Sequence, residues 1–551
     1  MKRSINTIYI YITIAVLGFL GVTQTSHAAN AVVGTGTAAS CTETAFDSAL
    51  LTASVGGGTI TFNCGPAPTT IQFSIVKLVT LGNVTIDGTN LITLNAGNND
   101  RHFFAGSGIT FHLKNITLRD GNSLVGGGAI EASGATVILD GVQLVNNYSS
   151  VSGGAIYCYD GTLTIRNSLF ENNGSGTGGA VYNDGCAVGI DDSRFLTNEA
   201  LDPLGRGGAI ANFPPGTLTL SDSLLQGNSA FDGGAIYNDT NSTAALSEVR
   251  LVANEAGHGG GIENSGTLTI VDSLLQGNKV TGSGGGLWNF GGAAEMERTT
   301  VSDNEANDGG GINSYGPQLR LTDVNIIDNT TQSHGGGIYH AGGTVFISNA
   351  TISGNRATDT TANGGGIYQN SDDNLTLTSV TLARNEAGNF GGGLYHFGRY
   401  AVLINVTIGE NSAGVAGDAI YEDSPMTPAN PGVVQIANSV LFGSSNNCAG
   451  GLFDSLGHNI SHGSCAPLVH AADLDNFAGN LRLGALAFNG GGFPMNTYLP
   501  QSGSPLVNAA DPGLCPSLDQ RSEIRAGICD IGAVEYDPNA PRLLYLPMIV
   551  R

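Results

Sequence analysis

Between residues 126 and 432 the chain repeats one alternation of apolar and polar positions. In each repeat, glycines precede one aliphatic residue, and a segment such as 267–270 then alternates threonine with leucine or isoleucine. A period of two is the signal of a β-strand with one buried face. Sequence rich in glycine, asparagine and threonine also has a low helix propensity. We therefore predict short strands joined by bends.

The aliphatic residue after the glycines, here called the anchor, fixes the length of the repeat. Eleven steps separate Ile130 from Ile420, so the period averages about 26 residues, which is typical of stacked repeats. The twelve anchors are Ile130, Ile156, Val181, Ile210, Ile236, Ile262, Leu287, Ile312, Ile338, Ile367, Leu394 and Ile420.

Two further rows keep the spacing of the anchors. One is apolar and runs from Phe170 to Ile408, and the other consists of asparagines from Asn173 to Asn411. Asparagines that stack on one another form hydrogen bonds along the stacking axis. The sequence thus predicts an all-β fold, a right-handed, single-stranded parallel β-helix (solenoid) with three short strands in each coil.

The segments on either side of the repeats differ from them in composition. A basic start, an apolar run and a small-residue site predict a secretory signal peptide, with an uncleaved anchor as the alternative. An amphipathic helix at 42–54 is expected to cover the open first coil. The predicted organisation is a signal peptide (1–28), an N-terminal cap with irregular coils (31–125), twelve regular coils (126–432), a C-terminal cap (433–540) and a short tail (541–551).

Charge and cysteine content narrow the function classes. The chain has 21 basic and 45 acidic residues, a net charge of −24, which argues against nucleic acid because phosphates require a basic surface. An even number of cysteines in an exported chain predicts disulfides. They fall into four local couples, with the pairing itself left open: Cys41 and Cys64, Cys158 and Cys186, Cys448 and Cys465, Cys515 and Cys529. No zinc or calcium motif is present, so neither a metal nor a cofactor is predicted.

Two parts of the chain carry a family resemblance. Gly-Gly-Ala-Ile combined with Phe-x-x-Asn, as from Phe170 to Asn173, resembles the repeat of chlamydial polymorphic outer-membrane proteins, and bacterial right-handed β-helix repeats more widely. The C-terminal region is similar to the choice-of-anchor Q domain, through motifs that include Asn446-Asn447-Cys448, Asp519-Gln520-Arg521 and Cys529-Asp530. The first resemblance implies the fold, and the second implies a cell-surface or secreted protein. The last residues are either a sorting tail or a final strand.

Two rows of polar or aromatic residues are candidates for chemistry on the outside of the rod. Four residues before the anchors lie Arg206, Asp232, His258, Asp308 and His334. An acid beside a histidine raises the histidine pKa and suits acid–base catalysis or metal binding; the alternative is polar decoration of a turn. One residue after the anchors lie Tyr339, Tyr368, Tyr395 and Tyr421, a predicted sugar-binding platform or, alternatively, a shield for the strands.

From these features we expect a non-enzymatic secreted or cell-surface protein, adhesin-like, that presents one face to a glycan or a surface protein. The mature chain is expected to have no transmembrane span, and envelope attachment would use the C-terminal tail. The alternatives are a polysaccharide lyase or glycoside hydrolase, and a purely structural envelope protein.

Overall fold

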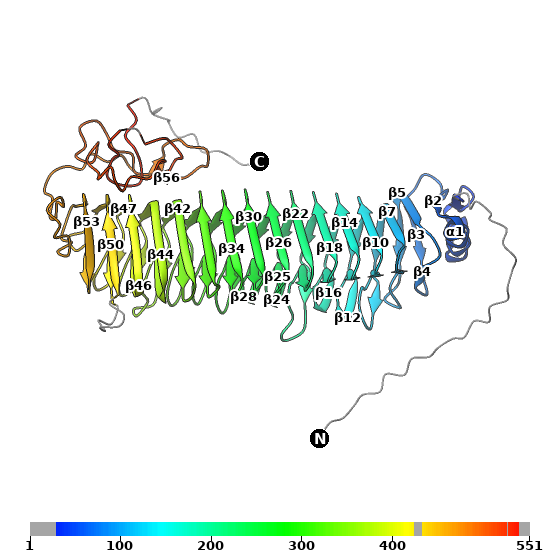
Figure 1. Ribbon diagram of the computed structural model, residues 1–551. Coiled ribbons are helices and arrows are strands. Elements are labelled where there is room, and N and C mark those ends of the chain that lie inside the picture. The colour runs from blue at the N-terminus through cyan, green and yellow to red at the C-terminus, as the bar shows by residue number, and fades with distance from the viewer. Residues whose placement is uncertain (1–28, 424–431, 526, 539–551) are drawn as a thin grey trace, which may run out of the picture.

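The computed structural model describes residues 29–423, 432–525 and 527–538. It is a parallel β-solenoid of about 16 turns, drawn out as a rod in Figure 1. The predicted signal peptide and the predicted tail at 541–551 lie outside the described residues. Within those residues, no helix has the length and apolar character needed to cross a membrane.

One coil shows how the repeat folds. It consists of β13 (Ile156–Tyr159), β14 (Thr162–Arg166), β15 (Leu169–Glu171) and β16 (Gly174–Thr177). The first three correspond to the predicted strands, and the fourth is additional. Strands of this fourth kind form their own 12-stranded sheet, whereas the others belong to a 42-stranded sheet. A coil therefore has four strands because the segment before the glycines also pairs with its neighbours.

The anchors begin the first strand of every regular coil, and each is fully buried. Ile130 pairs with Ile156 and Ile236 with Ile262, so the predicted register is confirmed. These strands are β9 (Ile130–Ser133), β13, β17 (Val181–Asp184), β21 (Ile210–Phe213), β25 (Ile236–Asn238), β29 (Ile262–Asn264), β33 (Leu287–Asn289), β37 (Ile312–Ser314), β41 (Ile338–His340), β44 (Ile367–Ala383), β46 (Leu394–Ile404) and β49 (Ile420–Glu422).

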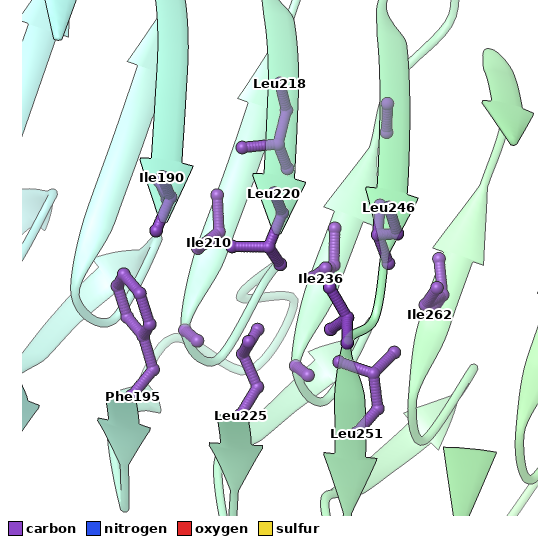
Figure 2. Packing of buried hydrophobic residues seen from close by; sticks show 14 of the residues in the cluster. Ile190, Phe195, Ile210, Leu218, Leu220, Leu225, Ile236, Leu246, Leu251 and Ile262 are labelled. Atoms are coloured by element: carbon purple, nitrogen blue, oxygen red, sulfur yellow. The ribbon is translucent and has the colours of Figure 1, made fainter. Parts of the chain in front are cut away.

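The core is a set of parallel stacks. Figure 2 shows the anchors Ile210, Ile236 and Ile262 in one stack, and Phe195, Leu225 and Leu251 in another. Like residues lie above like residues because the strands pair in register from coil to coil. Each apolar side chain is therefore covered from both sides, and the core continues along the whole rod.

The predicted asparagine row is a hydrogen-bonded ladder at one corner of the rod. The backbone N–H of Asn254 and its Nδ2 donate to Oδ1 of Asn278 at 3.0 and 2.9 Å. Asn278 in turn donates from Nδ2 to Oδ1 of Asn304 and to the carbonyl oxygen of Leu251, both at 3.0 Å. The ladder thus satisfies backbone groups that the bend leaves without strand partners.

The N-terminal end is closed as predicted. Helix α1 (Glu43–Gly56) buries Phe46, Ala49, Leu50 and Ala53, and it lies at the end of the rod in Figure 1. Its first turn is capped by the Thr42 hydroxyl, which accepts a hydrogen bond from the N–H of Ala45. The strands that follow α1 are β2 (Gly58–Phe62), β3 (Thr69–Gln72), β4 (Lys77–Val79), β5 (Val84–Asn95), β6 (Phe103–Ala105) and β7 (Thr110–Arg119).

The region predicted as a C-terminal cap has two parts. Its strands β50 (Val433–Ala437), β51 (Val440–Phe442), β52 (Cys448–Gly450), β53 (Phe453–Gly457) and β54 (Ile460–Ser461) continue the solenoid. Cys465 and Leu468 then join the same core and close its end.

The rest of this region, here called the lobe (residues 470–538), folds back along the side of the last coils (Figure 1). It includes β55 (Ala487–Phe488) and β56 (Asn496–Thr497). Gln520 is buried in the contact: its Nε2 donates to the carbonyl oxygen of Ala350 at 2.9 Å, and its Oε1 accepts from Thr381 at 2.5 Å.

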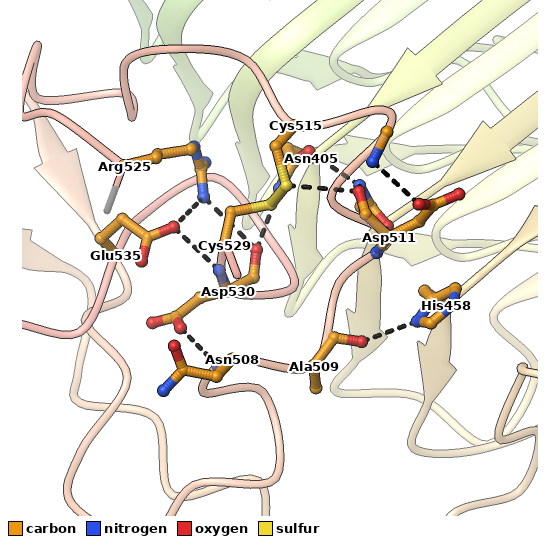
Figure 3. The surroundings of a disulfide bond; sticks show 12 residues. Asn405, His458, Asn508, Ala509, Asp511, Cys515, Arg525, Cys529, Asp530 and Glu535 are labelled. Carbon is orange, nitrogen blue, oxygen red and sulfur yellow. Dashed lines mark hydrogen bonds and ion pairs between the residues drawn. A yellow bond between two sulfur atoms is a disulfide. The ribbon is translucent and has the colours of Figure 1, made fainter. Parts of the chain in front are cut away.

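Four disulfides join the cysteines in the local couples noted in the sequence: Cys41–Cys64, Cys158–Cys186, Cys448–Cys465 and Cys515–Cys529. Cys158 and Cys186 come from neighbouring coils. Figure 3 shows Cys515–Cys529 beside the Arg525–Glu535 ion pair, where Asn405 of the rod donates to the carbonyl oxygen of Asp530 at 2.9 Å.

Candidate functional site

The row after the anchors is an aromatic ladder on the outside of the first strands. Consecutive ring centroids lie 4.7–6.4 Å apart, with one break between Tyr237 and Trp288. Where the row itself holds Ala211 or Asn313, an aromatic residue two positions later fills the gap. The ladder consists of Tyr157, Tyr182, Phe213, Tyr237, Trp288, Phe290, Tyr315, Tyr339, Tyr368, Tyr395 and Tyr421.

The four predicted binding tyrosines form one end of this ladder. Their centroid distances are 5.0, 4.9 and 5.8 Å, and their interplanar angles are 29°, 11° and 7°. Only 8 % of Tyr368 and 5 % of Tyr395 is exposed. The ring faces contact one another, so they are not open for a sugar to lie flat on them. Ligand binding at these residues stays a prediction, but it would have to use ring edges and hydroxyl groups.

The other candidate row lies against the ladder and is not a separate surface. The guanidinium of Arg206 lies 4.7 Å from the ring centroid of Tyr237. His258 stacks on Trp288 at 4.4 Å, and His334 stacks on Tyr368 at 4.5 Å. In each pair, the turn of one coil covers the aromatic ring of the next coil.

Both histidines accept a hydrogen bond from the backbone of the next coil. Nδ1 of His258 accepts from the N–H of Ser283 at 3.1 Å, and Nδ1 of His334 accepts from the N–H of Asn363 at 3.0 Å. A ring nitrogen that accepts a hydrogen bond carries no proton, so both imidazoles are neutral in this arrangement. Burial also lowers the pKa of His334, against the opposing effect of Asp308. These contacts favour a structural role for the two rings.

Two carboxyl groups occupy the break in the ladder. Glu263, which the sequence reasoning did not single out, is 4 % exposed and neighbours Asp232. Burial, reinforced by the charge of Asp232, raises the pKa of Glu263 to about 8. Burial also raises the pKa of Asp232, although Nε of Arg206 lies 3.9 Å from its Oδ2. Oε2 of Glu263 and Oδ1 of Asp232 have no hydrogen-bond partner.

The pKa values of both carboxyl groups are raised, as in an acid catalyst, but a substrate cannot reach the pair. A general acid must come within hydrogen-bond reach of the substrate atom that it protonates, and Glu263 is covered by its neighbours. Among the described residues, no group of three or more His, Cys, Asp or Glu side chains is placed to hold a metal ion.

Carboxylates also line the outer edge of the ladder. The hydroxyl groups of Tyr157, Tyr237 and Tyr395 donate to Asp184, Asp239 and Asp423 at 3.0, 3.0 and 2.5 Å. Burial raises the pKa of the three tyrosines, and the nearby carboxylates, which for Tyr237 include Glu263 before Asp239, raise it further. At these three positions the ladder thus presents hydroxyl and carboxylate groups at its edge.

A further row of polar residues lies inside the rod. Two positions after the anchors, asparagines bond from coil to coil, for example from Nδ2 of Asn238 to Oδ1 of Asn264 at 2.8 Å. Farther along, the row contains His340, Gln369, His396 and Glu422, all fully buried or nearly so. Nδ1 of His396 and Oε2 of Glu422 are joined by a hydrogen bond. This row is buried inside the rod and is therefore closed to ligands.

Comparison with known proteins agrees with one of the two resemblances. Residues 141–159 match the Chlamydia polymorphic membrane protein (Chlamydia_PMP) repeat; they contain Leu144, Asn147 and the Gly-Gly-Ala-Ile motif that ends at Ile156. No curated protein matches the chain, and no solved structure does. The chain is a β-solenoid in which one segment is similar to this repeat. The repeat and the disulfides indicate an envelope or extracellular protein.

Proposed function

We propose that the protein is a non-enzymatic, secreted or cell-surface rod, adhesin-like, that presents one face to glycans or other surface partners. The observation that carries this proposal is the regular solenoid of about 16 turns with a polymorphic-membrane-protein repeat. Its long, rigid side offers many equivalent positions to a partner. Four disulfides suit an oxidising compartment outside the cytoplasm.

The packing of the candidate catalytic residues supports a role without catalysis. Arg206, His258 and His334 cover aromatic rings of the ladder. The raised pKa values of Asp232 and Glu263 favour a polysaccharide lyase or glycoside hydrolase as the second candidate. A protein that serves only as an envelope layer is the third, because the regular coils suit it equally well.

We also propose that residues 433–540 form a choice-of-anchor Q-like region and that the tail at 541–551 attaches the protein to the envelope. The residues of the Asp519-Gln520-Arg521 motif make structural contacts, and these contacts support the assignment of the region. Asp519 is fully buried and forms an ion pair with Arg521 at 2.7 Å, while the neighbouring Gln520 joins the lobe to the rod.

Localisation and binding are tested separately. Producing cells are fractionated and treated with external protease, and loss of the protein from intact cells supports surface exposure. Purified protein is then applied to arrays of glycans and of surface proteins, and incubated with pectin and alginate. Protein that stays in the cytoplasm would overturn the location, and shortened polysaccharide chains would favour the enzyme.

A further inference from the structure

A cleft lies where the lobe meets the last coils. Its volume is about 640 Å³, within the range of roughly 300–1,000 Å³ that is typical of ligand sites. The rod contributes one wall and the lobe the other, so the cleft exists only because the chain folds back. Its lining includes Glu410, Phe442, His462, Asn480, Arg482 and Tyr498.

Phe442 gives the cleft an aromatic surface that differs from the ladder. Its ring lies directly over Gly409, where a Cβ atom would come within 2.2 Å of the ring. The ring of Tyr498 meets it edge-on, with the centroids 5.0 Å apart and an interplanar angle of 84°. No second ring is stacked on Phe442 among the described residues. Phe442 is half-buried and lines the cleft, so the part of its ring that these neighbours leave uncovered is open to a sugar.

Polar groups surround this ring. Glu410 is fixed because its Oε2 accepts from the Tyr498 hydroxyl at 2.9 Å and from Nε of Arg384 at 2.6 Å. Arg482 is exposed and donates from Nη1 to the carbonyl oxygen of Ser502 at 3.1 Å. His462 and Asn480 are exposed on the same lining. Carboxylate, amide and guanidinium groups around an aromatic ring match the hydroxyl groups and apolar C–H face of a sugar.

We propose that this cleft binds a short oligosaccharide, with one sugar ring against Phe442 and its hydroxyl groups held by Glu410, Asn480 and Arg482. The proposal rests on the glycan-binding part of the proposed function and gives it a place in the molecule. It is independent of the ladder tyrosines.

Binding of neutral and uronic-acid oligosaccharides to the full protein tests this assignment. Phe442→Leu keeps an apolar side chain over Gly409 but removes the aromatic face, and about tenfold weaker binding is expected, the upper end of the usual aromatic contribution. Arg482→Gln changes an exposed side chain, and at least threefold weaker binding is expected. Phe397→Leu is the matched control, because Phe397 is an aromatic residue of the rod, 38 % exposed, outside the cleft lining; its binding should not change.

The outcomes separate this assignment from the broader function. If the protein binds an oligosaccharide and neither cleft variant weakens binding, the cleft assignment is wrong while glycan binding stands. If no oligosaccharide binds, the cleft assignment fails together with glycan binding, but surface location and protein partners are decided by their own tests. Phe442→Leu can also weaken binding by loosening the fold around the cleft. Arg482→Gln changes an exposed side chain, so its result then decides whether the cleft binds the oligosaccharide.

Discussion

Removing one asparagine from the buried ladder should destabilise a defined part of the rod. The side chain of Asn278 takes part in four hydrogen bonds: two accepted from Asn254 and two donated, to Leu251 and Asn304. In Asn278→Ala all four are lost. The backbone N–H of Asn254 then has no acceptor in its buried position.

The size of the effect follows from these contacts. A buried donor without a partner costs about 1–3 kcal/mol, and each of the other three bonds contributes about 0.5–1.5 kcal/mol. We therefore expect the free energy of unfolding of this region to fall by about 2.5–7.5 kcal/mol. In a solenoid each coil contacts only its neighbours, so the loss should stay local.

Native-state hydrogen exchange of the coils around Asn254 and Asn278 is the suitable assay. A local loss of about 3 kcal/mol corresponds to exchange that is faster by roughly a hundredfold. Gln276→Ala is the matched control: it removes another side-chain amide of the same coil, one whose bond to Asp303 is exposed, and exchange should hardly change. Equal protection in Asn278→Ala and the control would refute the view that the ladder stabilises the rod.

Three further perturbations have expected results. The folded pKa of Glu263 is about 8, above its unfolded value, so its stabilising effect is complete below about pH 4 and lost as the pH rises through 8. In thermal melts from pH 5 to 9, Glu263→Gln should therefore lose less stability than the wild type. Parallel losses in the two proteins would contradict this. Replacing Cys158 and Cys186 with serine should cost about 3–4 kcal/mol in denaturant unfolding under oxidising conditions, with no difference expected once both proteins are reduced. Gln520→Ala removes the bond to Thr381, so limited proteolysis should release the lobe at lower protease concentrations. The circular dichroism of the rod should be retained. Release of the lobe at an unchanged protease concentration would exclude Gln520 as a main contact.

The stacking of the coils could be predicted from the sequence because equivalent positions recur at nearly constant spacing. When Ile236 is buried, the residue one repeat later, Ile262, occupies the same place in the next coil. The same reasoning found the asparagine ladder, whereas the end helix was predicted from its amphipathic pattern. It missed the fourth strand, since the short segments before the glycines have no clear alternation.

Contacts that run diagonally between coils were not predictable in this way. His258 and Trp288 belong to different rows and different coils, yet their rings stack. Phe213 fills a place in the ladder from a position two residues beyond the expected one. Reading each row separately therefore gave two candidate surfaces where the molecule has one. The lobe was also missed as a lateral element, because nothing in a non-repeating segment fixes the direction in which it packs.

The same regularity limits where a ligand can bind on the rod. In a continuous ladder each aromatic face is covered by its neighbour, as Tyr368 is by Tyr339 and Tyr395. A ring keeps part of its surface open where this stacking is interrupted. Phe442 lies at such a place, since its coil is among the last and Gly409 beneath it leaves room for the ring. The non-repeating lobe adds the second wall, so the end of the solenoid is where a specific site is physically easiest to build.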